Sequence, residues 1–180
     1  MTCIVGMTHK GKVWMGGDSA GTAGNMHQRI RADKKVFVKG EFIIGFCGSF
    51  RMGDLLKHTL GIPDPQRDVD PDAFMVNQFV DALRSCLEAE NKKAGLTGND
   101  RLYPSILVGF RGRLYNIESD YQCGRPEDGY DSVGSGSSVA VGALHASKSE
   151  PSVRKRIIMA LKAAARNDAA VRPPFHVLNI

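Results

Sequence analysis

Residues 2–18 read TCIVGMTHKGKVWMGGD, and this stretch decides the fold. Thr2 to Thr8 and Val13 to Gly17 have the composition of two strands, and Lys10-Gly11-Lys12 between them is typical of a tight turn. The pattern predicts a hairpin that starts with the first residues of the chain. The chain terminus is therefore expected to be fixed within the structure, with Asp18 close to Thr2.

The rest of the chain alternates between blocks of strands and blocks of helices. Two more hairpins are predicted, from Lys35 to Val38 with Phe42 to Cys47, and from Ile106 to Phe110 with Leu114 to Ile117. Helices are predicted for Met52 to Leu60, for about 20 residues from Pro71, for residues 137–145 and from Pro151, before a last strand from Phe175 to Ile180. Such blocks predict a layered α+β fold rather than a parallel βαβ fold.

Composition fits one globular domain, residues 1–180. Hydrophobic residues make up 42% and charged residues 24% of the 180, which excludes a disordered or a fibrous chain. The net charge of +5 is mildly basic and bears on solubility rather than on fold. No apolar run reaches the length of a membrane span, and no signal peptide is evident. A soluble protein of the reducing cytoplasm is expected, with its four cysteines as free thiols.

Several short motifs indicate no site of their own. The run Gly17 to Gly21 matches the G-x-S-x-G elbow of serine hydrolases, but only 18 residues precede Ser19, too few for the strands such an elbow follows. Gly134-Ser135-Gly136 lacks the third glycine of a dinucleotide fingerprint. The five histidines have no metal-binding spacing, so no metal or other cofactor is expected. Basic clusters such as Arg154-Lys155-Arg156 lack interleaved aromatic residues, so nucleic acid is not expected as a partner.

The chain terminus is the remaining candidate. Met1 is followed by Thr2, whose small side chain permits removal of the initiator methionine. A terminal threonine carries a hydroxyl nucleophile and an α-amine base, and the usual pKa of that amine, about 7.7–8.0, leaves part of it neutral at pH 7. A lysine nearby would lower that pKa further, and a carboxylate would hold the lysine in place. Asp18 is the expected carboxylate, and Lys34 and Lys35 are both candidates for the lysine.

A family resemblance rests on these residues in this order. Thr2-Cys3-Ile4-Val5, Gly17-Asp18, Thr22-Ala23-Gly24-Asn25, Lys34-Lys35-Val36, Ile43 to Gly48 and Gly134 to Ser137 together resemble proteasome β-subunits and the bacterial HslV peptidase. The resemblance spans most of the chain and is most specific in its first 50 residues. It implies the four-layer αββα sandwich of the N-terminal-nucleophile hydrolases.

The resemblance also implies roles for particular residues. The catalytic set would be Thr2 as nucleophile and base, Asp18, Lys35, Gly45 as oxyanion donor, Ser135 and Asp168. Lys35 is preferred over Lys34 because the family lysine directly precedes the apolar strand. Thr22 and Gly48 would bind substrate. Asp168 departs from the family pattern, since Val171 stands where a serine is expected.

The implied activity is that of a threonine endopeptidase. Such an enzyme would hydrolyse peptides or unfolded protein through an acyl-enzyme inside a homo-oligomeric ring. The chain has no nucleotide-binding motif, so any ATPase unfoldase would be a separate chain. Two alternatives stay open: a catalytically silent ring-forming or scaffold protein, and a hydrolase of small amides. Retention of Met1, the one residue before Thr2, would block the amine.

Glycine is the one skewed residue type, at 20 of 180. Eight glycines lie in the segments expected around Thr2: Gly16, Gly17, Gly21, Gly24, Gly45, Gly48, Gly134 and Gly136. The expectation is that they leave room for a substrate strand and an oxyanion.

Overall fold

The hairpin predicted at the start of the chain lies at the centre of an antiparallel sheet. In a computed structural model, which describes residues 2–23 and 27–180, β1 (Ile4–His9) pairs with β2 (Lys12–Gly17). β10 (Tyr130–Val133) flanks β1 and β11 (His176–Asn179) flanks β2, which gives the order β10-β1-β2-β11. The terminus is thus held between strands, as the pattern predicts, with Gly17 opposite Ile4.

A second sheet contains the other two predicted hairpins. Its order is β5-β6-β7-β8-β9, with β5 (Val36–Lys39), β6 (Phe42–Phe46), β7 (Ile106–Phe110), β8 (Arg113–Ile117) and β9 (Cys123–Gly124). A separate two-stranded ribbon consists of β3 (Ala20–Ala23) and β4 (His27–Ile30). The sequence pattern did not predict β3, β4, β9 or β10, because strands of two to four residues show too little alternation.

Side-chain caps mark the start of three of the helical segments. The first helical segment is α1 (Phe50–Asp54) with η1 (Leu55–Thr59), and it begins before the predicted Met52 because Ser49 accepts a hydrogen bond from Arg51 N. Further along come α2 (Pro71–Phe74), η2 (Met75–Phe79), α3 (Val80–Lys93), the short η3 (Gly98–Asp100), α4 (Ser137–Ala146) and α5 (Val153–Asn167). The long helix does begin at Pro71, whereas α5 begins after Ser152, which caps it, rather than at Pro151.

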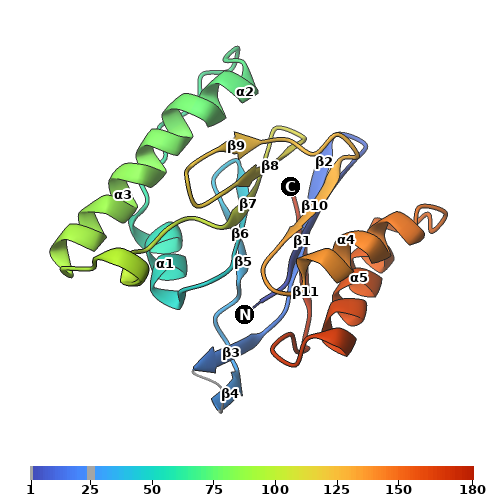
Figure 1. The fold of residues 1–180 in the computed structure, drawn as a ribbon. Helices are drawn as coiled ribbons and strands as arrows, with labels where there is room; N and C mark the ends of the chain where they lie inside the picture. Colours follow the sequence, from blue (N-terminus) through green and yellow to red (C-terminus); the bar gives the residue numbers. More distant parts are fainter. Residues whose placement is uncertain (1, 24–26) are drawn as a thin grey trace.

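These elements form four layers (Figure 1). One apolar cluster lies between α4, α5 and the four-stranded sheet, a second between the two sheets, and a third between the five-stranded sheet and the helices α1 to α3. Each sheet thus buries one face against the other sheet and one against helices. The αββα sandwich expected from the resemblance is confirmed.

The glycine expectation needs correction at several positions. A Cβ on Gly16 would lie 2.5 Å from a methyl of Ile157 in α5, and one on Gly45 would lie 2.5 Å from a methyl of Ile4 in β1. A Cβ on Gly17 would lie 2.8 Å from Ile4 as well. These glycines allow close packing between layers, because neighbouring side chains occupy the space that the sequence assigned to substrate.

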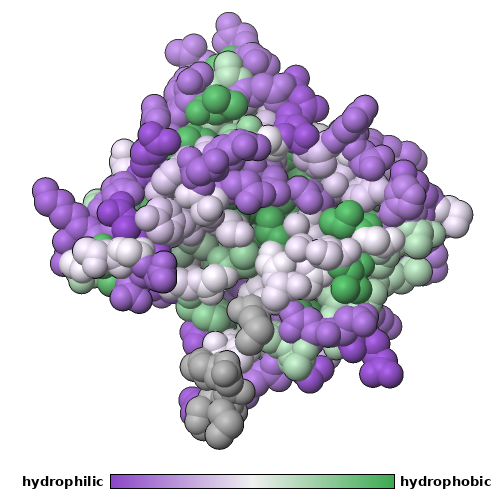
Figure 2. Space-filling view, in the orientation of Figure 1, coloured by the Kyte–Doolittle hydropathy of each residue, from purple (hydrophilic) through white to green (hydrophobic). Residues whose placement is uncertain are grey.

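The surface in Figure 2 is mostly polar, with apolar residues in small separate areas. Among the described residues, no helix combines the length and the apolar character that a membrane crossing requires.

Candidate active site

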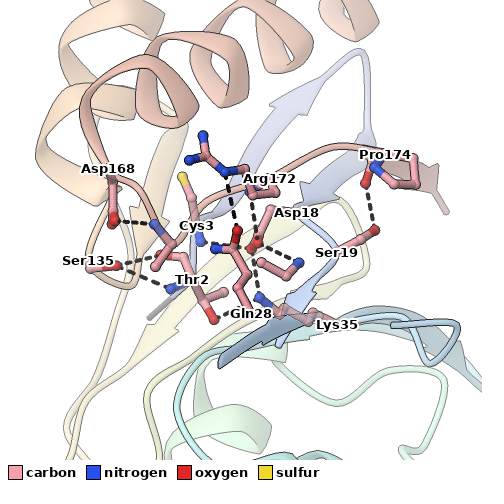
Figure 3. Close-up of polar contacts among 12 residues, drawn as sticks. Thr2, Cys3, Asp18, Ser19, Gln28, Lys35, Ser135, Asp168, Arg172 and Pro174 are labelled. Carbon is pink, nitrogen blue, oxygen red and sulfur yellow. Dashed lines mark hydrogen bonds and ion pairs between the residues drawn. The ribbon is translucent and has the colours of Figure 1, made fainter. Parts of the chain in front are cut away.

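Lys35 lies between Thr2 and Asp18. Its Nζ is 3.0 Å from Thr2 Oγ1 and 2.8 Å from Asp18 Oδ1, and the two charged side chains are 2% and 0% exposed (Figure 3). The hairpin β1–β2 brings Asp18 beside Thr2, and Lys35 reaches both from the start of β5. Lys34 is exposed, so the geometry distinguishes the two lysines that the sequence left open.

Asp18 accepts hydrogen bonds at both carboxylate oxygens. Oδ1 accepts from Lys35 Nζ and from Cys3 N at 3.1 Å, and Oδ2 accepts from Ala20 N at 3.0 Å and from Arg172 N at 3.4 Å. An ionised carboxylate has acceptor sites for these donors and no donor of its own. The arrangement therefore fits a charged Asp18 in a fixed orientation.

The segment Gly134-Ser135-Gly136 holds the backbone of Thr2. Thr2 N donates to Ser135 Oγ at 3.2 Å, and Ser135 Oγ and Gly136 N both contact Thr2 O, at 3.4 and 3.2 Å. Gly134 has a φ of +102°, and a Cβ there would lie 2.3 Å from Thr2 O. Only glycine fits this close approach. Met1, whose removal the small Thr2 side chain permits, lies outside the described residues.

Asp168 is near this segment but is held differently from Asp18. Its Oδ1 accepts from Ala170 N at 2.8 Å, and its Oδ2 is buried with no hydrogen-bond partner among the described residues. Val171, where the family pattern has a serine, is fully buried and lies against Gly136.

The amide of Gly45 is directed away from Lys35. Gly45 lies within β6, opposite Val36 of β5 and Leu107 of β7. Cys47 N donates to Ser105 O on the β7 side, and amides on one side of an antiparallel strand recur at every second residue. The Gly45 amide therefore points toward β7, which does not suit the oxyanion role expected for it.

Gly48 provides the better-placed amide. Phe46 N is on the opposite side of β6 and donates to Lys35 O at 3.1 Å. The next amide on that side, beyond the end of the pairing with β5, is that of Gly48. Gly48 is exposed with a φ of +97°, and no described residue accepts a hydrogen bond from its N–H.

Thr22 lies on β3, opposite Gln28 of β4. Its Oγ1 is buried and has no hydrogen-bond partner among the described residues. Gly24 and Asn25 of the same motif lie outside the described residues. A role of Thr22 in substrate binding remains a prediction.

The segment from Arg172 to Pro174 lies beside Asp18 and is fixed there by hydrogen bonds that the sequence did not indicate. Ser19 N donates to Arg172 O at 3.0 Å and Ser19 Oγ donates to Pro174 O at 2.6 Å, so this serine is buried and engaged in structure. Gln28 accepts from Arg172 Nε at 3.3 Å. These bonds place the Arg172 amide on Asp18, and no sequence signal could have found it, because every residue but proline carries such an amide.

The cysteines near the site are protonated thiols. Burial raises the pKa of Cys3 to about 12, against a smaller opposing effect of its hydrogen bond with Ser132. Burial also raises the pKa of Cys47, which donates to Ser105 Oγ. All four cysteines are free, as predicted. Within residues 2–23 and 27–180, no group of three or more His, Cys, Asp or Glu side chains is placed to hold a metal ion.

Comparison with known proteins identifies the fold. No protein-family model matches the sequence, and no curated protein matches it. Solved structures do match: Thiobacillus denitrificans BPH has a TM-score of 0.78 at 18% identity, with 99% of this chain and 97% of that chain covered. HslV from Trypanosoma brucei has a TM-score of 0.70 at 21% identity, covering 99% and 98%. Anbu from Yersinia bercovieri has a TM-score of 0.73 at 13% identity, covering 99% and 81%. The chain has the fold of the proteasome-like N-terminal-nucleophile hydrolases.

Proposed function

We propose that this chain, once Met1 is removed, is a threonine peptidase with Thr2 as its nucleophile. The observation that carries the proposal is the buried Lys35, in contact with both the Thr2 hydroxyl and Asp18. Removing two charges from water costs several kcal/mol for each ion, and an apolar pair would fill the same space without that cost. A buried lysine–aspartate pair that contacts the hydroxyl of Thr2 therefore favours a catalytic role over a purely structural one.

The first half-reaction uses both polar groups of Thr2. After loss of Met1, the Thr2 nitrogen becomes an α-amine, already in contact with Ser135 Oγ. In its neutral form the amine takes the proton from Oγ1, while the Lys35 ammonium donates a hydrogen bond to the oxygen and stabilises its developing charge. Oγ1 then attacks the carbonyl carbon of the peptide, and the carbonyl oxygen becomes an oxyanion.

Collapse of that intermediate breaks the C–N bond. The Thr2 ammonium returns its proton to the leaving amine, and an ester to Oγ1 remains. Water, deprotonated by the same amine, attacks the ester, the acid product leaves, and Oγ1 regains its proton. We assign the oxyanion donor to the Gly48 amide in place of Gly45, and one such donor contributes about 3–4 kcal/mol to transition-state stabilisation.

The roles of Asp18, Ser135 and Asp168 follow from their contacts. Asp18 orients Lys35, and Ser135 orients the amine. Asp168 accepts from Ala170 N and would help to shape the segment behind Ser135 and Gly136. Thr22 would pair with the backbone of a bound peptide from β3.

We further propose that the chain acts as a homo-oligomer. An Anbu complex from Pseudomonas aeruginosa, which matches this chain with a TM-score of 0.70 at 17% identity, forms a helical assembly. For this chain a closed homomeric ring around the sites is proposed, with peptides or unfolded protein as substrates and a separate ATPase as a possible partner. Sedimentation of the purified protein tests the ring, and a monomer at micromolar concentration would contradict it.

Peptide hydrolysis tests the peptidase proposal. The processed protein should cleave members of a peptide library, and Thr2→Ala or Lys35→Met should lower kcat/KM by about 10²- to 10⁴-fold. Thr97→Ala, at an exposed threonine far along the chain, is the matched control and should retain activity. Cleavage of small amides but no peptides would favour the small-amide alternative. If the protein without Met1 hydrolyses neither peptides nor small amides, the result would favour the catalytically silent scaffold protein.

Epoxomicin provides a second readout. A structure of Thiobacillus denitrificans BPH contains this compound. The processed wild-type chain should gain the mass of one epoxomicin, and Thr2→Ala should gain none. A wild-type chain that retains Met1 and forms no adduct would contradict the proposal.

A further inference from the structure

The side chain of Arg31 packs on Phe50, whose ring lies near the Lys35 ammonium. A Cβ on Gly21 would lie 2.5 Å from Arg31 Cδ and 3.3 Å from Phe50, so the arginine stem lies directly over β3 and next to α1. The guanidinium carbon is 4.1 Å from the centroid of the Phe50 ring. Lys35 Nζ is 5.9 Å from the same centroid and 3.0 Å from Thr2 Oγ1. Phe50 thus packs against Arg31 and lies near Lys35, which contacts the reacting hydroxyl.

Hydrogen bonds at the backbone N–H and at Nε of Arg31 fix the direction in which its two terminal nitrogens point. Its backbone N–H donates to Ser19 O at 2.9 Å, and its Nε donates to both carboxylate oxygens of Asp33, at 2.9 and 2.8 Å. No described residue accepts a hydrogen bond from the two terminal nitrogens. The guanidinium therefore presents donors with the geometry that a second carboxylate prefers.

The proton path gives the orientation of a peptide across Thr2. The leaving amine takes its proton from Thr2 N, which lies at Ser135 on one side of the residue. The acyl part of the substrate then lies on the other side, toward Lys35 and Phe50. A side chain next to the scissile carbonyl on this acyl side would extend toward the Phe50 ring, on which Arg31 stacks.

We propose that Arg31 is a specificity-determining residue that selects an acidic side chain on the acyl side of the scissile bond. This inference rests on the peptidase function proposed above. Asp33 lies at the Nε edge and holds the guanidinium in place, so a substrate carboxylate would bind at the terminal nitrogens without displacing it. Because Arg31 is 44% exposed, solvent weakens the pairing, and a modest preference is expected.

Paired substrates test the proposal. Peptides that differ only by Glu or Gln at the acyl-side position are compared by kcat/KM, and wild type should prefer Glu by about two- to fivefold, as expected for a solvent-exposed ion pair. Arg31→Gln should bring the Glu-to-Gln ratio close to one, and Arg31→Lys should keep part of it. Arg29→Gln, the same charge change at an exposed residue of β4, is the matched control and should keep the wild-type ratio.

Three results would overturn the proposal. Wild type could cleave the Gln peptide as fast as the Glu peptide, or Arg31→Gln could keep the full ratio. Equal losses in Arg31→Gln and Arg29→Gln would assign the preference to net charge rather than to this contact. In each case hydrolysis itself is observed, so the peptidase function stands. Absence of cleavage of every peptide would instead overturn the peptidase function, and this inference with it.

Discussion

Replacement of Lys35 by methionine should destabilise the protein far more than a typical surface change. Lys35→Met keeps most of the side-chain volume but removes the ammonium from the buried pair, in which Nζ and Asp18 Oδ1 are 2.8 Å apart. The Asp18 side chain, which is 0% exposed, then keeps its backbone N–H donors but has no positive charge beside its carboxylate. Breaking a buried pair by removing one partner costs about 3–5 kcal/mol.

Urea unfolding followed by the fluorescence of Trp14, the single tryptophan, measures this cost. With a urea dependence of about 2 kcal/mol per molar, the midpoint of Lys35→Met should fall by about 1.5–2.5 M. Lys148→Met is the matched control, because Lys148 pairs with Asp128 at 3.4 Å and the two side chains are 50% and 61% exposed. Its midpoint should barely change.

A double variant separates charge from packing. Lys35→Met combined with Asp18→Asn removes both charges, so its loss of stability should be clearly smaller than the sum of the two single losses. Strictly additive losses, or equal midpoints for Lys35→Met and Lys148→Met, would refute the reasoning that the buried pair interacts directly.

Three further predictions follow from packing and from pKa values. Gly45→Ala should lower the free energy of unfolding by about 1–3 kcal/mol, because its Cβ would lie 2.5 Å from an isoleucine methyl of β1. Gly142→Ala in α4, where the space is open, is the control and should not lower it. Urea unfolding measures both variants. Because burial raises the pKa of Cys3 to about 12, iodoacetamide at pH 8 should leave Cys3 unmodified in the folded protein and alkylate it in urea; peptide mapping that finds rapid alkylation of folded protein would contradict this. Burial raises the pKa of Asp72, but hydrogen bonds from a tyrosine and an arginine of β8 outweigh it and hold that pKa below its usual value. A lowered pKa in the folded state stabilises the protein above the unfolded-state value of about 3.9 and loses this effect as the pH falls through the folded-state value. The difference in Tm between wild type and Asp72→Asn should therefore shrink below about pH 4, and a constant difference would refute it.

Much of the site was predictable because it depends on residue types close in sequence. The first hairpin alone places Asp18 beside Thr2, and the lysine before an apolar strand reaches both. The four layers likewise follow from strands that are apolar on both faces, such as Phe42 to Phe46. The short strands β3 and β4 left no such pattern, although they place Thr22.

Other parts of the site depend on backbone groups and on register. The donor from Arg172 to Asp18 is an amide, which no residue type indicates. The difference between Gly45 and Gly48 as oxyanion donor depends on which side of β6 each amide faces, and that alternation is fixed only once the partners in β5 and β7 are known. Sequence spacing carries no information on it.

We propose above that Thr2 Oγ1 is the nucleophile of a chain that has lost Met1. The most direct measurement is acid quenching during turnover of an activated peptide ester, followed by tandem mass spectrometry of the intact chain and its N-terminal peptide. We predict an acyl group on Thr2 as the first residue, in wild type and not in Thr2→Ala. An acyl group on another residue such as Ser135, or turnover by a chain that retains Met1, would contradict it.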